Sequence, residues 1–199
     1  MNRFEAALEE VERSFEKIGR PWALVGALAV AARAEARATL DIDVAVAVED
    51  PEQASEVVSS LRVMGYAWQS EVGGFMTSFL VPAGPEAGLR LDVLFSLAGI
   101  EAEVAKRAER IEILPGLEIP VASLGDLIAM KLLGAGEPGR EHDWRDLRSL
   151  VARASDEDLE VTLAAIASLG IQGRASAHQL EARLRSVLEG REPGLSSPR

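Results

Sequence analysis

The sequence contains no cysteine and only two histidines, His142 and His178. The first absence excludes disulfide bonds, thiolate zinc sites and cysteine nucleophiles, and the second leaves too few imidazoles for a histidine-built metal centre. Any metal ion that this chain binds must therefore be held by carboxylates.

The sequence also has no long apolar run and no excess of basic residues. The apolar run at residues 22–32 is too short to span a bilayer, and residues 1–19 form a charged amphipathic pattern unlike a signal peptide. We therefore expect a cytoplasmic protein without a membrane partner. The net charge of -11 repels a phosphate backbone, which argues against general DNA binding and favours a small or cationic partner.

The order of predicted elements divides the chain of 199 residues into three parts. Strands and helices alternate at first, whereas the later part is helical and the last residues are rich in glycine, proline and serine. We predict an α/β core over residues 1–122, a helical bundle over residues 123–190 and a flexible tail over residues 191–199.

The first part of the chain predicts a helix, a strand, a glycine turn, a second helix and a second strand. Apolar residues recur on one helical face in residues 2–18, and residues 22–25 form a short apolar run typical of a strand. After Gly26, the alanine-rich residues 27–36 favour a helix. Large and small side chains then alternate in residues 42–48, which predicts a strand.

Further strands and a short helix are expected in the rest of the core. Residues 66–71 and 75–81 flank the hairpin signal Gly73-Gly74, and residues 89–95 read as a third strand. Residues 101–109 predict a short charged helix, followed by extended pieces at 111–114 and 117–119.

Helix starts are marked by a capping side chain with an acid or amide three residues later. The pairs are Asp50 with Gln53, Ser123 with Asp126, Ser155 with Asp158, and Ser176 with Gln179. One more helix is expected over about residues 140–153.

Carboxylates gather on the predicted strands. Asp41 and Asp43 project from one side of a strand, and Asp92 lies in the middle of the strand at residues 89–95. Such crowded negative charge is costly unless a hard cation such as Mg²⁺ neutralises it. The alternative is that Asp41 and Asp43 are turn residues and Asp92 is solvated.

The glycine turn before these aspartates suggests a phosphate site. Gly26 lets the backbone approach a ligand, and the following helix N-terminus offers unpaired N–H groups. Gly26 could equally serve the turn alone. Arg37 could contact phosphate and Thr39 could hold the aspartates in place, although both residue types are common in exposed loops.

A lysine lies on the apolar stripe of a later helix. Lys131 follows Leu124 and Leu127 at helical spacing, so its side chain is expected on the buried face. Its ammonium could reach triphosphate oxygens or extend past the edge of a groove into solvent. Asp143 and Asp146 could orient Lys131 or Arg140, or could be helix-start charges favoured by the helix dipole.

These segments together resemble a known superfamily. Val25–Ala27 with Arg37–Val44 resembles the signature of nucleotidyltransferases with the DNA polymerase beta-type fold, and Leu91–Val93 is similar to the strand of their third carboxylate. Asp126–Leu132 followed by Asp143–Leu147 resembles the AbiEii-type branch, which includes toxins of bacterial toxin–antitoxin pairs.

The resemblance implies a fold and a set of roles. The fold is α/β (α+β), a mixed sheet flanked by helices and followed by a C-terminal helical segment. The roles are metal binding and catalysis at Asp41, Asp43 and Asp92, nucleotide binding at Gly26, Ala27, Arg37, Thr39 and Lys131, and support at Arg140, Asp143 and Asp146.

The implied activity is a Mg-dependent transfer of a nucleoside monophosphate from an NTP to a hydroxyl, with two Mg²⁺ ions. The acceptor stays open between tRNA, protein and a small cationic molecule, and an antitoxin is a candidate partner. The family usually has Gly-Ser or Gly-Gly where this chain has Gly26-Ala27. The alternative is therefore a catalytically degenerate protein that binds nucleotide or docks a partner.

Overall fold

The computed structural model describes residues 3–35, 39, 41–73, 76–82, 88–95, 99–135 and 140–190. The predicted phosphate contact Arg37 and the predicted tail at 191–199 lie outside these residues. The chain divides into two compact units. The first runs to Ala122, and the second begins at Ser123 and also includes Arg33–Glu35.

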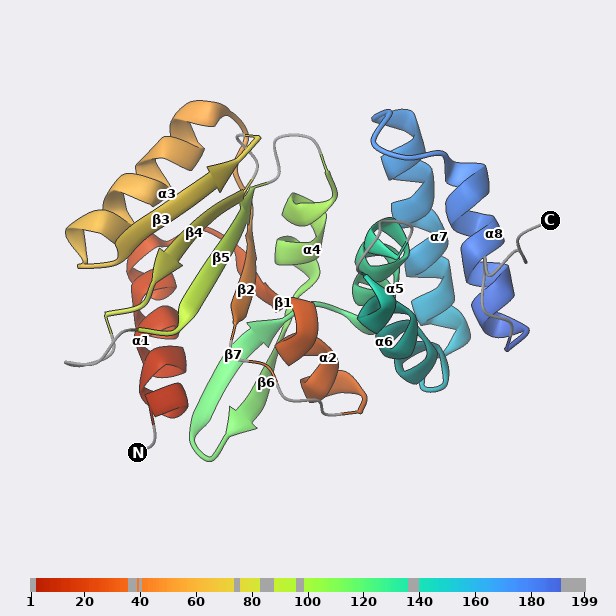
Figure 1. Ribbon diagram of the computed structural model, residues 1–199, viewed down its shortest axis with the longest axis horizontal. Helices are drawn as coiled ribbons and strands as arrows, with labels where there is room; N and C mark the ends of the chain where they lie inside the picture. Colours follow the sequence, from red (N-terminus) through yellow and green to blue (C-terminus); the bar gives the residue numbers. More distant parts are fainter. Residues whose placement is uncertain are drawn as a thin grey trace. The chain divides into compact units, whose positions relative to one another are not determined.

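The strands of the first unit are β1 (Trp22–Val25), β2 (Ile42–Val46), β3 (Ala67–Val72), β4 (Met76–Leu80), β5 (Arg90–Phe95), β6 (Glu109–Leu114) and β7 (Leu117–Val121). In the part of the chain that the structure describes, they form one seven-stranded sheet in the order β3-β4-β5-β2-β1-β7-β6 (Figure 1). The pairs β2–β5 and β1–β7 are parallel, and the other neighbouring pairs are antiparallel. This mixed sheet confirms the predicted fold class.

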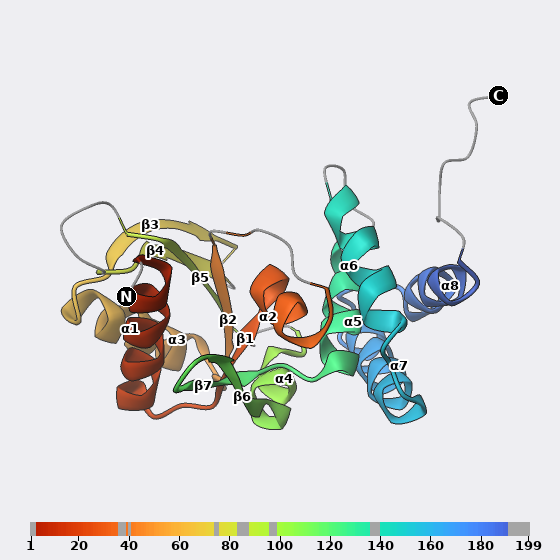
Figure 2. The same cartoon turned by 90° about the horizontal axis from the view of Figure 1, so that it is seen from below.

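The helices of the first unit are α1 (Arg3–Ile18), α2 (Gly26–Arg33), α3 (Pro51–Val63) and α4 (Glu101–Arg107). Helices α1 and α3 lie side by side (Figure 2), and α4 packs against β1 and β2. The apolar stripe of α1 buries Phe15, whose ring stacks on that of Trp22 with centroids 5.1 Å apart. The predicted cap of α3 is confirmed, because the carboxylate of Asp50 accepts the N–H of Gln53 at 2.8 Å.

Several predicted boundaries are wrong: the helix expected over residues 27–36 ends at Arg33, and the strand expected over residues 42–48 ends at Val46. The helix expected over residues 101–109 ends at Arg107, and Glu109 already belongs to β6, where it pairs with Val121 of β7. Charged side chains fit an exposed helix and an exposed edge strand equally well, so only the pairing with β7 separates the two structures.

The second unit is helical, with α5 (Leu124–Gly134), α6 (Glu141–Val151), α7 (Asp156–Ile171) and α8 (Ala177–Leu188). Helix α5 contacts each of the other three. The side chains of Ser123, Ser155 and Ser176 cap α5, α7 and α8 as predicted. Among the described helices, none combines the length and apolar character needed to cross a membrane.

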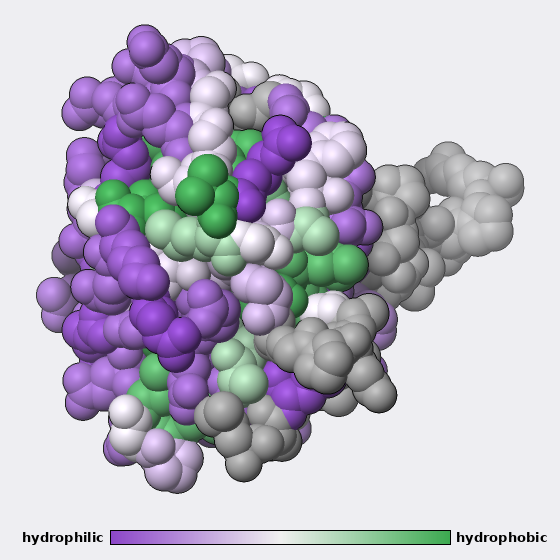
Figure 3. Space-filling view, turned by 90° about the vertical axis from the view of Figure 1, so that its left-hand side faces the viewer, coloured by the Kyte–Doolittle hydropathy of each residue, from purple (hydrophilic) through white to green (hydrophobic). Residues whose placement is uncertain are grey.

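One side of the molecule is mainly hydrophilic. On the side shown in Figure 3, hydrophilic side chains dominate and hydrophobic ones appear in several groups between them. The apolar core of the first unit lies instead at the sheet, where Leu24, Val44 and Val93 have no exposed surface.

Candidate functional site

Gly26 is the point at which β1 turns into α2, and it lies against Asp43. Its φ of 66° is in the left-handed region that favours glycine. A Cβ atom on Gly26 would lie 2.6 Å from Cγ of Asp43 and closer still to Oδ2. Both the backbone conformation and the missing side chain are therefore needed to seat the Asp43 carboxylate beside the turn.

A row of polar side chains crosses the sheet at the position of Asp43. Asp43 on β2 pairs with Asp92 on the parallel strand β5, and Asp92 pairs with Ser78 on the antiparallel strand β4. Residues in register on neighbouring strands share one face and are about 4.8 Å apart. The predicted placement of Asp43 and Asp92 on matching faces is thus produced by the parallel pairing of β2 with β5.

Asp41 and Arg90 stand one step earlier along the same two strands. Ile42 pairs with Leu91, so Asp41 and Arg90 directly precede that pair. Asp41 is exposed, and its N–H lies 3.4 Å from Oγ1 of Thr39. Thr39 therefore contacts the segment that leads into the aspartates.

Arg90 and Ser78 both bind Asp92 through one oxygen. Oδ1 of Asp92 accepts the hydroxyl of Ser78 at 2.6 Å and Nε–H of Arg90 at 2.9 Å, and Nη2 of Arg90 lies 3.2 Å from Oγ of Ser78. The hydrogen bond to Asp92 is the largest cause that raises the pKa of Arg90 above its ordinary value, and the negative charges of Asp92, Asp41 and Asp43 add to it.

Neither Arg90 nor Ser78 is among the site residues predicted from the sequence. Arg90 is readable from sequence as a neighbour of Asp92 on the same strand face, because it stands two positions before Asp92. Ser78 carries no such signal, because its place beside Asp92 depends on the pairing of β4 with β5.

The carboxylate oxygens of Asp41, Asp43 and Asp92 are of the ligand type that a hard divalent cation takes. As the side chains stand, however, the described residues contain no group of three carboxylates, histidines or cysteines gathered closely enough to hold a metal ion. Asp92 is instead engaged by Arg90 and Ser78. The missing side chain of Gly26 leaves room for the Asp43 carboxylate directly beside the glycine turn.

The second unit contains a buried ionic cluster around Lys131. Nζ of Lys131 lies 2.7 Å from Oδ1 of Asp143 and 2.7 Å from Oδ2 of Asp146. Arg140 donates from Nε to Oδ2 of Asp143 at 2.7 Å. A Cβ atom on Gly134 would lie 2.7 Å from Nη2 of Arg140. The predicted contacts of Asp143 and Asp146 with Lys131 are therefore present.

The side chain of Lys131 is only 10% exposed, as predicted from its place on the apolar stripe of α5. Its two partners are almost fully buried as well. A buried ammonium needs such partners because desolvation is costly. The alternative of an ammonium that extends past a groove edge into solvent is wrong.

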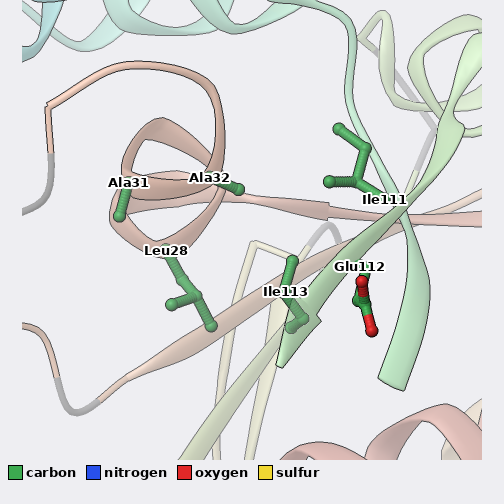
Figure 4. Close-up of a pocket in the computed structure, with 6 residues that line it drawn as sticks. All are labelled: Leu28, Ala31, Ala32, Ile111, Glu112 and Ile113. Carbon is green, nitrogen blue, oxygen red and sulfur yellow. The ribbon is translucent and has the colours of Figure 1, made fainter. Parts of the chain in front are cut away.

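A pocket of about 200 Å³ lies between α2 and β6 (Figure 4). Leu28 and Ile113 line it from two sides, and Glu112 is its one charged residue. None of the predicted site residues lines this pocket. Its volume is below the roughly 300 Å³ at which ligand pockets usually begin.

The chain matches a protein family described as nucleotidyl transferase AbiEii toxin, type IV toxin–antitoxin system, over residues 8–193. The chain belongs to this AbiEii family. The predicted resemblance to the AbiEii branch is thereby confirmed, and this AbiEii protein is a member of a nucleotidyltransferase family. A comparison with curated proteins found no match.

Solved structures share the fold of this AbiEii protein at low sequence identity. An antigenic nucleotidyltransferase-like protein from Paracoccidioides brasiliensis has a TM-score of 0.57 at 16% identity, covering 90% of this chain and 93% of the other. The antibiotic-resistance factor ANT(2'')-Ia has a TM-score of 0.52 at 18% identity, and the match covers 96% of each chain. The nucleotidyltransferase toxin MenT4 from Mycobacterium tuberculosis H37Rv has a TM-score of 0.53 at 19% identity, and the match covers 83% of this chain and 62% of the other.

Proposed function

We propose that this AbiEii protein transfers a nucleoside monophosphate from a magnesium-bound NTP to a hydroxyl group of an acceptor, with release of pyrophosphate. The observation that carries the proposal is the pairing of Asp43 with Asp92 on neighbouring strands, with Gly26 directly beside Asp43. Carboxylates next to a glycine turn combine metal ligands with a backbone that a phosphate can approach.

Asp41, Asp43 and Asp92 are proposed to hold two divalent ions. When bound, Mg²⁺ would offset the charge of the triphosphate and activate the attacking hydroxyl. The role of this chain is to fix the carboxylates: β2 and β5 hold Asp43 and Asp92 in register, and Thr39 lies against the backbone of Asp41.

The nucleotide contacts are proposed at Gly26, Ala27, Arg37, Thr39 and Lys131. The first N–H groups of α2 have no partner within their own helix, so Gly26 and Ala27 can offer them to a phosphate. For Lys131 the support is a compact ammonium that Asp143 and Asp146 hold in one position. Arg140 adds to this support through Asp143.

The acceptor is proposed to be a tRNA, a protein or a small cationic molecule. The net charge of -11 favours a cationic acceptor, because long-range repulsion works against a polyanion. Membership of a toxin family supports a role as the toxin of a toxin–antitoxin pair, with an antitoxin protein as partner.

The proposal is tested with labelled NTPs, Mg²⁺ and the three acceptor classes. Replacing Asp41→Asn together with Asp43→Asn should lower transfer by about a hundredfold or more, since the metal supplies several kcal/mol of transition-state stabilisation. The control is Glu52→Gln, an exposed acid of α3 in the same unit. Transfer that survives the double substitution would place the metal site elsewhere.

Ala27 favours a second candidate, a protein that binds nucleotide without transferring it. Ala27 is 6% exposed, and its methyl group offers no hydroxyl at the glycine turn. Calorimetry separates the two candidates, because Mg-NTP binding without turnover on any acceptor supports the second. An Ala27→Ser variant that gains transfer would show that the missing hydroxyl limits the reaction.

A further inference from the structure

Arg90 is placed differently from an ordinary surface arginine. Its side chain is 49% exposed, yet its Nε is directed to Oδ1 of Asp92. The side chain of Asp92 is only 11% exposed. A carboxylate this deeply buried is stabilised by a cation or by hydrogen-bond donors, and Asp92 has both. The guanidinium therefore does for Asp92 what a bound cation would do.

The position of Arg90 also places it within the electrostatic influence of Asp41 and Asp43. Arg90 directly precedes Leu91, and Asp41 directly precedes Ile42, the register partner of Leu91. The charges of Asp41 and Asp43 act on Arg90. A divalent ion that uses Asp92 meets a carboxylate whose Oδ1 already accepts a hydrogen bond from the positively charged guanidinium of Arg90. Like charges close together oppose each other strongly near a protein surface.

We propose that Arg90 is a resident counter-ion of the acidic face formed by Asp41, Asp43 and Asp92. Arg90 stabilises Asp92 while no metal is bound, and it weakens the binding of a divalent metal at Asp92. This inference rests on the metal site of the proposed function. Arg90 is a positioning residue in this proposal: it acts on metal binding through Asp92. Arg90 and the metal ion compete for the same carboxylate. Asp92 therefore stays stabilised when no metal is bound, and it binds metal less tightly than it would without the charge of Arg90.

The first test measures Mn²⁺ binding to the full chain by calorimetry, in the absence of nucleotide. Arg90→Gln should bind Mn²⁺ about tenfold more tightly than the wild type, because one positive charge near a divalent ion is removed. Arg90→Lys keeps the charge and should stay near the wild type. The matched control is Arg110→Gln, since Arg110 also holds carboxylates, Glu12 and Glu16, but lies on the edge strand β6.

A Ser78→Ala variant separates charge from hydrogen bonding. Ser78 donates to the same oxygen as Arg90 but is neutral. Its removal should change Mn²⁺ affinity much less than Arg90→Gln does. An equal tightening in both variants would show that freeing Oδ1, and not removing the charge, controls metal binding, and would overturn the proposal.

The second test compares melting temperatures with and without Mg²⁺. Without metal, Arg90→Gln should melt below the wild type, and millimolar Mg²⁺ should narrow or reverse that gap because the variant binds the ion more tightly. A merely structural arginine would leave the same gap at every Mg²⁺ concentration, which would contradict the proposal.

The Asp43→Asn variant distinguishes the failure of the counter-ion proposal from the failure of the metal site. If Mn²⁺ binding depends on Asp43 but is unchanged in Arg90→Gln, the counter-ion proposal fails and the metal site stands. If Mn²⁺ binding does not depend on Asp43, or is absent in every variant, the proposed metal site fails and the counter-ion proposal fails with it.

Discussion

Both units of the molecule place a glycine and a cation against aspartates, but they bury them to different degrees. In the first unit Gly26 lies against Asp43, and the half-exposed Arg90 binds Asp92. In the second unit Gly134 lies against the Arg140 and Asp143 pair, and Lys131 is 10% exposed between two carboxylates.

This difference in burial separates an exchangeable charge from a fixed one. Where one partner of an ion pair is half-exposed, as Arg90 is, water and salt screen the attraction more than in a fully buried pair, so a competing cation can replace that partner. Breaking a buried pair costs about 3–5 kcal/mol because a charge is left without a partner in a poorly solvated place. The Arg90 pair therefore suits a site that changes its occupant, and the Lys131 cluster suits a positive charge that is held in one position.

The strongest test of this comparison is Lys131→Met. The free energy of unfolding should fall by about 3–5 kcal/mol, because Asp143 and Asp146 lose the buried cation between them. Urea denaturation followed by circular dichroism measures the loss. Lys106→Met, an exposed lysine of α4, should change stability by less than about 0.5 kcal/mol. If Lys131→Met lowered the free energy of unfolding less than Arg90→Gln does without metal, the distinction between the two clusters would be wrong.

Gly26→Ala tests whether the glycine turn shapes the acidic site. An alanine at a positive φ costs about 1–3 kcal/mol. The matched control is Gly19→Ala, because Gly19 has a similar φ of 71° and a Cβ atom there would meet nothing within 4 Å, whereas a Cβ atom on Gly26 collides with Asp43. Both variants should lose stability in urea denaturation, with the larger loss for Gly26→Ala.

The same pair of variants has a second readout in metal binding. Only Gly26→Ala should weaken Mn²⁺ binding, because only there must the Asp43 carboxylate move. Equal Mn²⁺ affinities in the two variants would show that Gly26 serves the turn alone.

The smallest expected effect is the response to salt. Raising NaCl from about 0.05 M to 1 M shortens the screening length from more than 10 Å to about 3 Å. The stability difference between Arg90→Gln and the wild type, measured without divalent ions, should shrink toward zero. The cost of Lys131→Met should stay nearly constant in the same series, because the ammonium of Lys131 is buried together with its carboxylates, whereas the guanidinium of Arg90 is half-exposed. Equal salt dependence would mean that the two clusters are screened alike.

Local signals in the sequence predicted much of the fold. The caps at Asp50 and Ser155 depend on a side chain and a backbone N–H three residues away, so a short segment carries all the information. The helix predicted over residues 101–109 is too long for the opposite reason: Glu109 joins a strand because Val121, distant in sequence, pairs with it.

Short stretches of sequence were enough to indicate which side chains could form a site: Gly26 as the break after a strand, the alternating Asp41 and Asp43, and a lysine on an apolar stripe. These features follow from the periods of strands and helices, which are local. The partners of these side chains depend on the folded chain. Strand pairing placed Ser78 beside Asp92, and helix packing placed Asp143 and Asp146 around Lys131, because such contacts join residues far apart in the chain.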